Sequence, residues 1–257
     1  MSPASRQIAE NLARVRERID LAASRAGRRA EDITLIAVSK THPGEKIHEL
    51  YEAGVRHFGE NRVQERESKA AQLAGLNITW HMIGHLQKNK AARAAGLFDT
   101  IDSVDSLALA EKLDRARDAF TAGDAENNDK SIQSEKSKHF STEKRLRVLI
   151  EVKLDPEPAK SGVEPDELPR IAEAILRLPG LHLCGLMGVP PYFDDPEQAR
   201  SYFRRLHQLR DALIAHLHSE QLAVLSMGMS HDFEIAIEEG ATEVRVGTAL
   251  FGERPKI

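Results

Sequence analysis

The sequence has little of what marks several protein classes. Its only cysteine is Cys184, so neither an internal disulfide framework nor a cysteine-rich zinc site can form, and the apolar run around it makes it a core residue. No stretch approaches the roughly 18 consecutive apolar residues of a membrane-spanning helix. The amino terminus lacks the apolar segment of a secretory signal. We therefore expect a cytoplasmic protein that is not inserted into a membrane.

An excess of positive charge is also missing. The 257 residues include 36 lysines and arginines against 40 acidic residues, so the net charge is −4 and no basic face for nucleic acid is expected. Acidic and basic residues are interspersed, which indicates a solvated exterior.

What the sequence does contain is a regular alternation of strands and helices. An amphipathic helix over residues 4–26 comes first, with apolar residues spaced by three and four. Short apolar runs then predict strands at 33–40, 55–58, 78–83, 98–101, 146–152, 181–187, 223–225 and 243–246. Helices are predicted between them, at 45–53, 62–73, 87–95, 105–119, 165–178, 195–217 and 230–238. Asn61 with Gln64, and Asp195 with Gln198, resemble caps at two of these helix starts.

This alternation predicts an α/β fold, a single (β/α)8 TIM barrel over residues 1–257 with an extra N-terminal helix. The alternative is an open, doubly wound sheet, but no G-x-G-x-x-G fingerprint follows the first strand. Residues 120–144 interrupt the pattern, because they are polar and show no sustained period. They predict a mobile insertion in the barrel domain.

Lys40 stands at the end of the first predicted strand, where barrel enzymes place their chemistry. Burial of a lysine disfavours its charged form, and a neutral amine can form a Schiff base with an aldehyde. The alternative is a lysine that reaches from the strand end into solvent.

Two further loops at the same predicted rim are rich in small residues. Ser226-Met227-Gly228-Met229-Ser230 follows the seventh strand, and Gly247 with Thr248 follows the eighth. Barrel enzymes often bind phosphate with these two loops, using backbone N–H groups and hydroxyls. The alternative is that the glycines only permit tight turns and that Ser230 only caps a helix.

Arg245 lies within the eighth predicted strand, between Val244 and Val246. If the valines face the helices, the guanidinium points into the barrel. There it would either pair with a barrel carboxylate or donate a hydrogen bond to an acceptor on a ligand. An amine, a phosphate cup and an inward arginine together suggest a phosphorylated aldehyde, pyridoxal 5′-phosphate.

Several contiguous motifs, spread from the first strand to the end of the chain, carry a family resemblance. They are AVSKTH, FGENRVQE, WHMIGHLQKNK, AKSG, CGLMGV, LSMGMSHDFEIAI and VRVGTALFG. With these motifs the sequence resembles the pyridoxal phosphate homeostasis protein family, also called the YggS/PROSC family. Residues 120–144 look like an insertion relative to that family.

The resemblance implies an alanine-racemase-like barrel that binds pyridoxal phosphate, with a role for each matching residue. Lys40 would be the Schiff-base lysine, Asn61 would lie beside the ring, and Arg245 would face the pyridine nitrogen. Ser226, Ser230, Gly247 and Thr248 would hold the phosphate. The family implies a monomer that buffers the cofactor and affects vitamin B6 and amino-acid balance, with pyridoxal-dependent apo-enzymes as candidate partners.

The residues also bear on catalysis. A ring nitrogen that faces arginine stays neutral and makes the cofactor a weak electron sink. Tyr51, Tyr192 and Tyr202 are the only tyrosines, and none has the position of a second racemase base. We therefore expect a cofactor-binding protein without catalytic residues, and a weak amino-acid racemase is the alternative. His81 and His85 are four residues apart but lie on no H-E-x-x-H helix, so no metal site is expected.

Overall fold

Eight parallel strands form a closed barrel in the computed structural model, which describes residues 3–126, 145–155, 157, 160–219 and 221–252. The strands follow one another around the barrel in chain order, and β1 pairs with β8 to close it. They are β1 (Thr34–Val38), β2 (His57–Glu60), β3 (Thr79–Met82), β4 (Thr100–Val104), β5 (Leu146–Val152), β6 (Leu181–Gly188), β7 (Val224–Met229) and β8 (Glu243–Val246). The predicted barrel is confirmed, and the open sheet is excluded because β1 and β8 share a parallel register.

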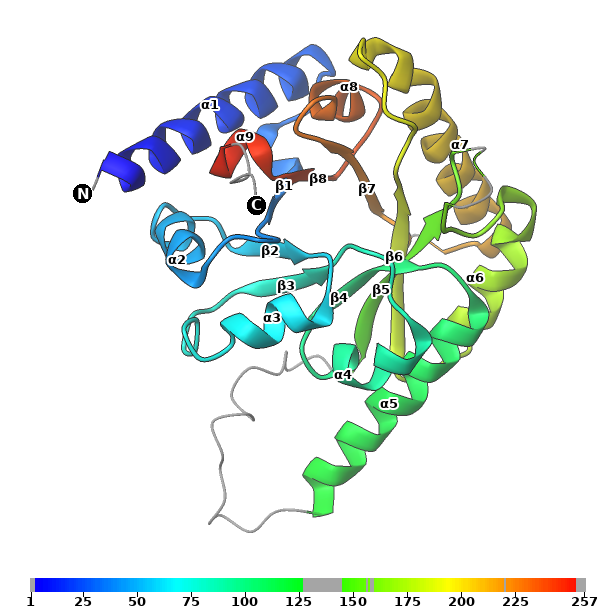
Figure 1. Ribbon diagram of the computed structural model, residues 1–257. Coiled ribbons are helices and arrows are strands. Elements are labelled where there is room, and N and C mark those ends of the chain that lie inside the picture. Colours follow the sequence, from blue (N-terminus) through cyan, green and yellow to red (C-terminus); the bar gives the residue numbers. More distant parts are fainter. Residues whose placement is uncertain (1–2, 127–144, 156, 158–159, 220, 253–257) are drawn as a thin grey trace.

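Helices surround the strands (Figure 1). They are α1 (Pro3–Arg25), α2 (Gly44–Glu52), α3 (Val63–Lys69), α4 (Ala91–Ala95), α5 (Leu107–Glu126), α6 (Leu168–Leu176), α7 (Arg200–Leu217), α8 (Phe233–Glu238) and α9 (Thr248–Phe251). Their apolar faces pack on the outer faces of the strands in one continuous core. Within the described residues, no helix is long and apolar enough to cross a membrane.

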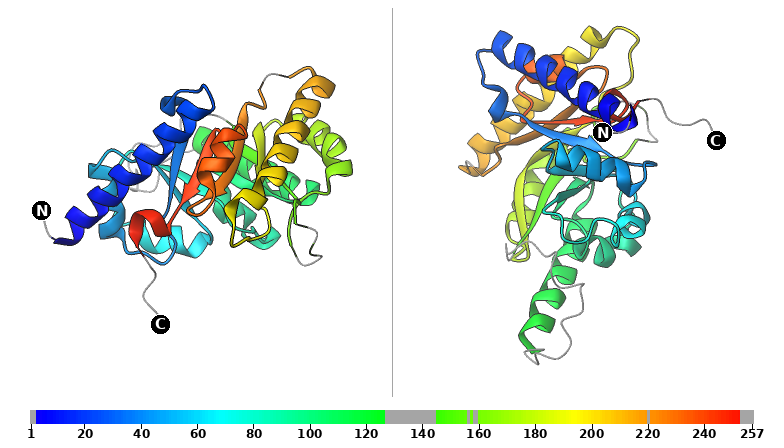
Figure 2. Two further views of the ribbon diagram at one scale, coloured as in Figure 1. Left: turned by 90° about the horizontal axis from the view of Figure 1, so that it is seen from above. Right: turned by 90° about the vertical axis from the view of Figure 1, so that its left-hand side faces the viewer.

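The predicted N-terminal helix is α1, which lies along α8 and α9 (Figure 2). Its apolar stripe is buried, with Leu12 and Val15 at 2% and 1% exposure. Asn11 donates a hydrogen bond to the carbonyl of Leu250 in α9 (2.8 Å). Because α8 and α9 follow β7 and β8, α1 supports the part of the barrel that carries the last two loops.

Two local predictions about β7 and α8 differ from the structure. Ser226–Met229 belong to β7 itself, because the strand runs four residues past its predicted end at residue 225. Asp232, not Ser230, precedes the first turn of α8, and its carboxylate accepts a hydrogen bond from the N–H of Met229 (2.6 Å). Ser230 is therefore not a helix cap, and its hydroxyl has other partners.

The predicted cap at Asn61 and Gln64 is also shifted. Glu65 accepts the backbone N–H groups of Asn61 (3.1 Å) and Arg62 (3.0 Å), and α3 begins at Val63. A glutamate one residue further along the chain reaches both donors, so Asn61 does not cap the helix with its side chain. The cap predicted at Asp195 is confirmed, since its carboxylate accepts the N–H of Glu197 (3.0 Å).

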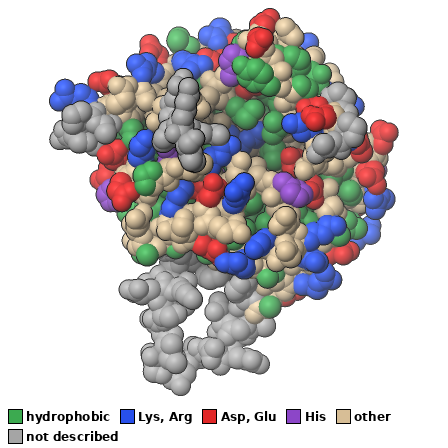
Figure 3. All heavy atoms as spheres, in the orientation of Figure 1, with side chains coloured by type: hydrophobic (Ala, Val, Ile, Leu, Met, Phe, Trp, Pro, Cys, Tyr) green, Lys and Arg blue, Asp and Glu red, His purple; other side chains and the backbone are tan. Residues whose placement is uncertain are grey.

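The predicted insertion begins later than its composition indicated. The helix predicted to end at residue 119 continues to Glu126, so residues 120–126 belong to α5. Residues 127–144 lie outside the described residues. Elsewhere, acidic and basic side chains are mixed over the face shown in Figure 3, as the composition predicted. Cys184 is buried at 3% exposure and packs on Leu149 and Met187, which confirms its place in the core.

Candidate functional site

Lys40 lies in a tight turn directly after β1. The N–H of Ser39 donates to the carbonyl of Gly59 in β2 (3.0 Å), and the N–H of His42 turns back to the carbonyl of Ser39 (3.0 Å). Thr41 adopts a left-handed conformation with φ of 66°, which is uncommon for a residue with a side chain. Lys40 is half-buried at the rim of the barrel. The turn is therefore tied to β2 and has a strained backbone, which fixes where the lysine begins.

A buried ion pair lies directly beneath this turn. Lys69 of α3 donates to Glu60 (2.6 Å) and to the carbonyl of Ser39 (2.9 Å), and the Ser39 hydroxyl donates to the same Glu60 oxygen (2.7 Å). Glu60 is fully buried and Lys69 is 6% exposed. Burial raises the pKa of Glu60, and the charge of Lys69 opposes that shift.

The ion pair between Lys69 and Glu60 was not predicted from the sequence. Glu60 directly precedes Asn61, and Ser39 directly precedes Lys40. By binding both, Lys69 holds together the ends of β1 and β2, which carry the two predicted ligands. The available signal was the helical spacing of Lys69 from Arg66, which places both on the buried face of α3.

Asn61 and Gly84 hold the ends of β2 and β3 together. A Cβ at Gly84 would come within 2.5 Å of the carbonyl oxygen of Asn61 and 2.8 Å of its Cα. Only glycine permits this approach. The Ser103 hydroxyl also donates to the carbonyl of Gly84 (2.6 Å). Asn61 is half-buried at the same rim as Lys40.

The two loops predicted to bind phosphate converge on one hydroxyl. The Ser230 oxygen accepts the N–H groups of Gly247 (3.2 Å) and Ala249 (3.4 Å). These amides and the exposed Thr248 open the short helix α9. Grouped backbone amide donors of this kind suit an anion.

The same amides lie beside the end of β1. A Cβ at Gly247 would stand 3.5 Å from the Cβ of Val38, two residues before Lys40. The reason is the register of the closing strands, in which Ala37 pairs with Val246. Barrel closure thus brings the predicted amine and the predicted phosphate loop next to each other, although some 200 residues separate them in the chain.

Arg245 points into the barrel and is 4% exposed. One guanidinium nitrogen donates to the carbonyl (2.7 Å) and the hydroxyl (2.9 Å) of Ser226, and the other donates to the carbonyl of Gly188 (3.0 Å). Within the described residues no carboxylate forms an ion pair with it, so of the two alternatives for Arg245 the pairing with a barrel carboxylate is not what the structure shows. Burial lowers the pKa of Arg245, and nearby acids including Asp102 and Asp232 oppose that shift.

Ser226 occupies a deeper level than the other predicted phosphate ligands. It is fully buried within β7, and its hydroxyl accepts a hydrogen bond from Arg245. The structure therefore brings Lys40, Asn61, Ser230, Gly247 and Thr248 to the rim and sets Ser226 and Arg245 one level below.

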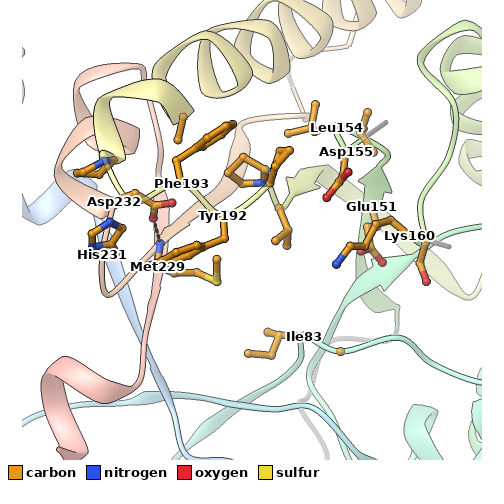
Figure 4. A pocket seen from close by; sticks show the side chains of 18 of the residues that line it. Ile83, Glu151, Leu154, Asp155, Lys160, Tyr192, Phe193, Met229, His231 and Asp232 are labelled. Carbon is orange, nitrogen blue, oxygen red and sulfur yellow. Dashed lines mark hydrogen bonds between the residues drawn. The ribbon is translucent and has the colours of Figure 1, made fainter. Parts of the chain in front are cut away.

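A cavity of about 410 Å³ opens at the same rim, between the ends of β3, β5, β6 and β7. Figure 4 shows Glu151, Asp155 and Lys160 on one side of it, and Tyr192, Phe193 and Met229 on the other. Burial and the neighbouring charge of Asp105 raise the pKa of Glu151 to about 7. Met229 and His231 flank Ser230 and line this cavity, so it adjoins the predicted phosphate loop. Glu151 was not predicted from the sequence, because it resembles an ordinary strand residue there.

The chain has close relatives over nearly its full length. Residues 10–255 match the family described as alanine racemase, N-terminal domain. The chain is 45% identical over 245 residues to the pyridoxal phosphate homeostasis protein of Aquifex aeolicus, covering 95% of this chain and 97% of that protein. The protein of the same name from Escherichia coli K12 is 39% identical, covering 96% and 97%.

Solved structures agree with this grouping. PipY of Synechococcus elongatus, described with PLP bound, is 38% identical, has a TM-score of 0.78 and is matched over 96% of this chain and 100% of its own. An alanine racemase of Clostridium difficile, at 16% identity and a TM-score of 0.66, covers 97% of this chain and is itself covered over 57%. That similarity shows a shared barrel fold.

Proposed function

The chain belongs to the family of pyridoxal phosphate homeostasis proteins, whose fold is that of the alanine racemase N-terminal domain, and on this premise we propose that it binds pyridoxal 5′-phosphate and buffers its intracellular supply. The observation that carries the proposal is that Gly247 packs against Val38. This contact puts the amide cluster of α9, the N–H groups of Gly247 and Ala249, beside the turn of Lys40. A small phosphorylated aldehyde is a ligand that one amine and one anion site can share.

Each ligand residue has a role that its surroundings support. Lys40 would hold the aldehyde, since it is half-buried on a fixed turn. Ser230 and the N–H groups of Gly247 and Ala249 would bind the phosphate, together with Thr248. Asn61, directly after β2, would contact the ring.

Arg245 would bind the ring nitrogen, and Ser226 would support Arg245. The Ser226 hydroxyl accepts from the guanidinium, and that contact fixes the guanidinium plane. We therefore assign Ser226 an indirect part in cofactor binding, through Arg245. Bound pyridoxal phosphate would supply electrophilic carbonyl chemistry at the rim, while the protein supplies orientation and charge.

We propose that the protein does not depend on catalysis for its role. An arginine is always protonated and can only donate a hydrogen bond to the ring nitrogen, so that nitrogen would stay unprotonated and the ring would be a weak electron sink. Tyr51 lies on α2, where its hydroxyl accepts the N–H of Asn77 (3.3 Å), and Tyr202 packs on Phe193 from α7. Neither tyrosine faces the Lys40 turn.

A weak amino-acid racemase is the second candidate, and the cavity beside the site favours it. Glu151, with its pKa near 7, can exchange a proton at neutral pH, and the exposed Tyr192 lines the same cavity. Incubation with single L-amino acids, followed by chiral chromatography, separates the two. Sustained formation of D-amino acid that is lost in Glu151→Gln would favour the racemase.

The decisive test of the main proposal is spectroscopic. Purified protein with added pyridoxal phosphate should show the yellow absorption band of a lysine Schiff base, and Lys40→Ala should lack it. Lys112→Ala, on the exposed side of α5, is the matched control and should keep the band. Borohydride reduction and peptide mass mapping should place the label on Lys40. A label on another lysine would refute the assignment.

We propose that the protein acts as a monomer and that pyridoxal-dependent apo-enzymes receive the cofactor from it. Size-exclusion chromatography with light scattering tests the oligomeric state. Recovery of activity by an apo-enzyme separated from the loaded protein by a dialysis membrane would show that only free cofactor is transferred.

A further inference from the structure

The barrel interior contains a second polar site, below Arg245 and separate from the rim. His81 of β3, Asp102 of β4 and Glu243 of β8 are at most 6% exposed. One ligand atom from each lies within 4.8 Å of the other two. Since β8 is not a neighbour of β3 or β4, these side chains can meet only inside the barrel.

Two oxygens of this group have no hydrogen-bond partner within the described residues. They are Oδ1 of Asp102 and Oε2 of Glu243, and both are shielded from solvent. A buried carboxylate oxygen without a partner is costly, and most such groups in proteins are satisfied by a donor or an ion. Arg245 and Arg147 influence Glu243 electrostatically, but the described hydrogen bonds of Arg245 go to Ser226 and Gly188 instead.

The spacing of His81 and Asp102 suits a small divalent cation, and the Glu243 carboxylate lies within 4.8 Å of both. Nδ1 of His81 lies 3.2 Å from Oδ2 of Asp102. Two ligands at about 2.0–2.1 Å from a tetrahedral metal are separated by roughly 3.3 Å. The Glu243 carboxylate can supply a third oxygen, and an imidazole with two carboxylates is a donor set that Zn²⁺ and other first-row divalent metals accept.

His57 completes the arrangement behind His81. Its Nδ1 lies 3.0 Å from Nε2 of His81, so the two rings share one hydrogen bond. If His81 donates that proton, its Nδ1 lone pair is directed at Asp102. A partner on the far nitrogen is the usual way in which a metal-binding histidine is oriented.

A cavity of about 590 Å³ lies at the amino-terminal end of the barrel, and its lining includes His57. The carboxylates of Glu17, Asp20 and Glu31 in this lining outnumber its two arginines, Arg16 and Arg56. A cation that enters there would meet His57, which is hydrogen-bonded to His81. We infer that His81, Asp102 and Glu243 form a binding site for a divalent transition-metal ion, with Zn²⁺ the best match. The site is independent of the proposed cofactor site at the opposite end.

The test is metal binding by the untagged, full-length protein after treatment with a chelator and dialysis. Zn²⁺ is added alone, and binding is followed by calorimetry and by the melting temperature. Co²⁺ serves as the spectroscopic probe, because its visible bands report coordination by nitrogen and oxygen. The parent should bind about one ion per chain and melt at a higher temperature with Zn²⁺. A parent that binds no ion, or whose melting temperature Zn²⁺ does not raise, overturns the inference without any variant.

The variants locate the site. Glu243→Gln and Asp102→Asn should abolish the binding and the Co²⁺ bands, and His57→Ala should weaken binding by roughly tenfold or more. The matched control is Glu173→Gln, which removes the carboxylate of an exposed pair with His216 (2.8 Å) and should leave binding unchanged.

The competing arrangement is a proton in place of the metal, with His57 donating to His81 and His81 to Asp102. Equal binding by the parent, Glu243→Gln and Asp102→Asn, or a loss confined to Glu173→Gln, would show that the ion binds elsewhere and would refute the metal site. The yellow band of the loaded protein should persist in Glu243→Gln. That result keeps failure of the metal site distinct from failure of the cofactor site.

Discussion

The ring of His42 is stacked on the ring of Phe251, with centroids 4.4 Å apart and planes inclined by 15°. His42 follows the Lys40 turn, and Phe251 closes α9, the helix that carries the amide cluster. The contact therefore joins the two halves of the proposed cofactor site from below. His42 is 6% exposed, so this is a packing contact of the interior.

Loss of this stack should weaken cofactor binding more than it weakens the fold. His42→Ala removes an aromatic contact worth about 0.5–1.5 kcal/mol beyond its buried area, which corresponds to a two- to tenfold rise in the dissociation constant for pyridoxal phosphate. His42→Phe keeps a ring and should bind like the parent. Absorbance titration measures both. Equal weakening in the two variants would show that the imidazole nitrogens matter rather than the stack.

The buried pair beneath Lys40 should respond unequally to single and double substitution. Lys69→Met leaves Glu60 buried without its cation, which costs about 3–5 kcal/mol of unfolding free energy when only one partner is removed. Adding Glu60→Gln should restore a large part of that loss. Urea denaturation of the four proteins in the cycle gives the coupling energy. Additive losses would mean that the pair does not act as a unit.

Glycine at position 84 should be required for the shape of the site. A Cβ there meets backbone atoms of Asn61, which cannot move aside as a side chain can. Gly84→Ala should therefore cost about 1–3 kcal/mol of unfolding free energy and displace Asn61. In Gly44→Ala the added Cβ meets only the flexible side chain of Gln72, so this control should be milder. Thermal denaturation and cofactor titration compare the two variants.

Glu151 should make stability depend on pH in a defined direction. Its pKa of about 7 in the folded protein lies above the ordinary value of 4.5, so the folded state holds this proton more tightly than the unfolded state. The resulting stabilisation is full below pH 4.5 and is lost as the pH rises through 7. Glu151→Gln should therefore gain up to about 3 kcal/mol relative to the parent between pH 4.5 and 8. Urea denaturation across that range measures the gain, and a constant difference would contradict the shifted pKa.

Arg245 should matter for the bound cofactor more than for folding. Arg245→Ala removes the three hydrogen bonds to Ser226 and Gly188, and we expect weaker pyridoxal phosphate binding with a shifted absorption band. Arg245→Lys keeps the charge but not the planar fork, so it should recover folding better than the spectrum. If Arg245→Ala fails to fold while Arg245→Lys binds pyridoxal phosphate normally, the positive charge alone is needed inside the barrel.

The sequence by itself determined the fold class, the strand order and which residues lie at strand ends. Apolar runs such as 33–40 and 146–152 bury both faces and read as parallel strands, and parallel strands in a barrel direct their carboxyl ends to one rim. That rule alone placed Lys40, Asn61, Ser230 and Gly247 together. Boundaries were less certain, because the composition of residues 120–126 does not distinguish a solvated helix from a loop.

Only the tertiary structure decided which buried polar groups meet. The pairing of Lys69 with Glu60, and the meeting of His81, Asp102 and Glu243, depend on barrel closure and on the register between strands distant in sequence. The level of Ser226 beneath Ser230 likewise follows from the length of β7. Local periodicity reports which face a side chain takes on its own strand. Periodicity does not say which side chain of another strand a given side chain will meet, because the register between strands in the closed barrel sets that partner.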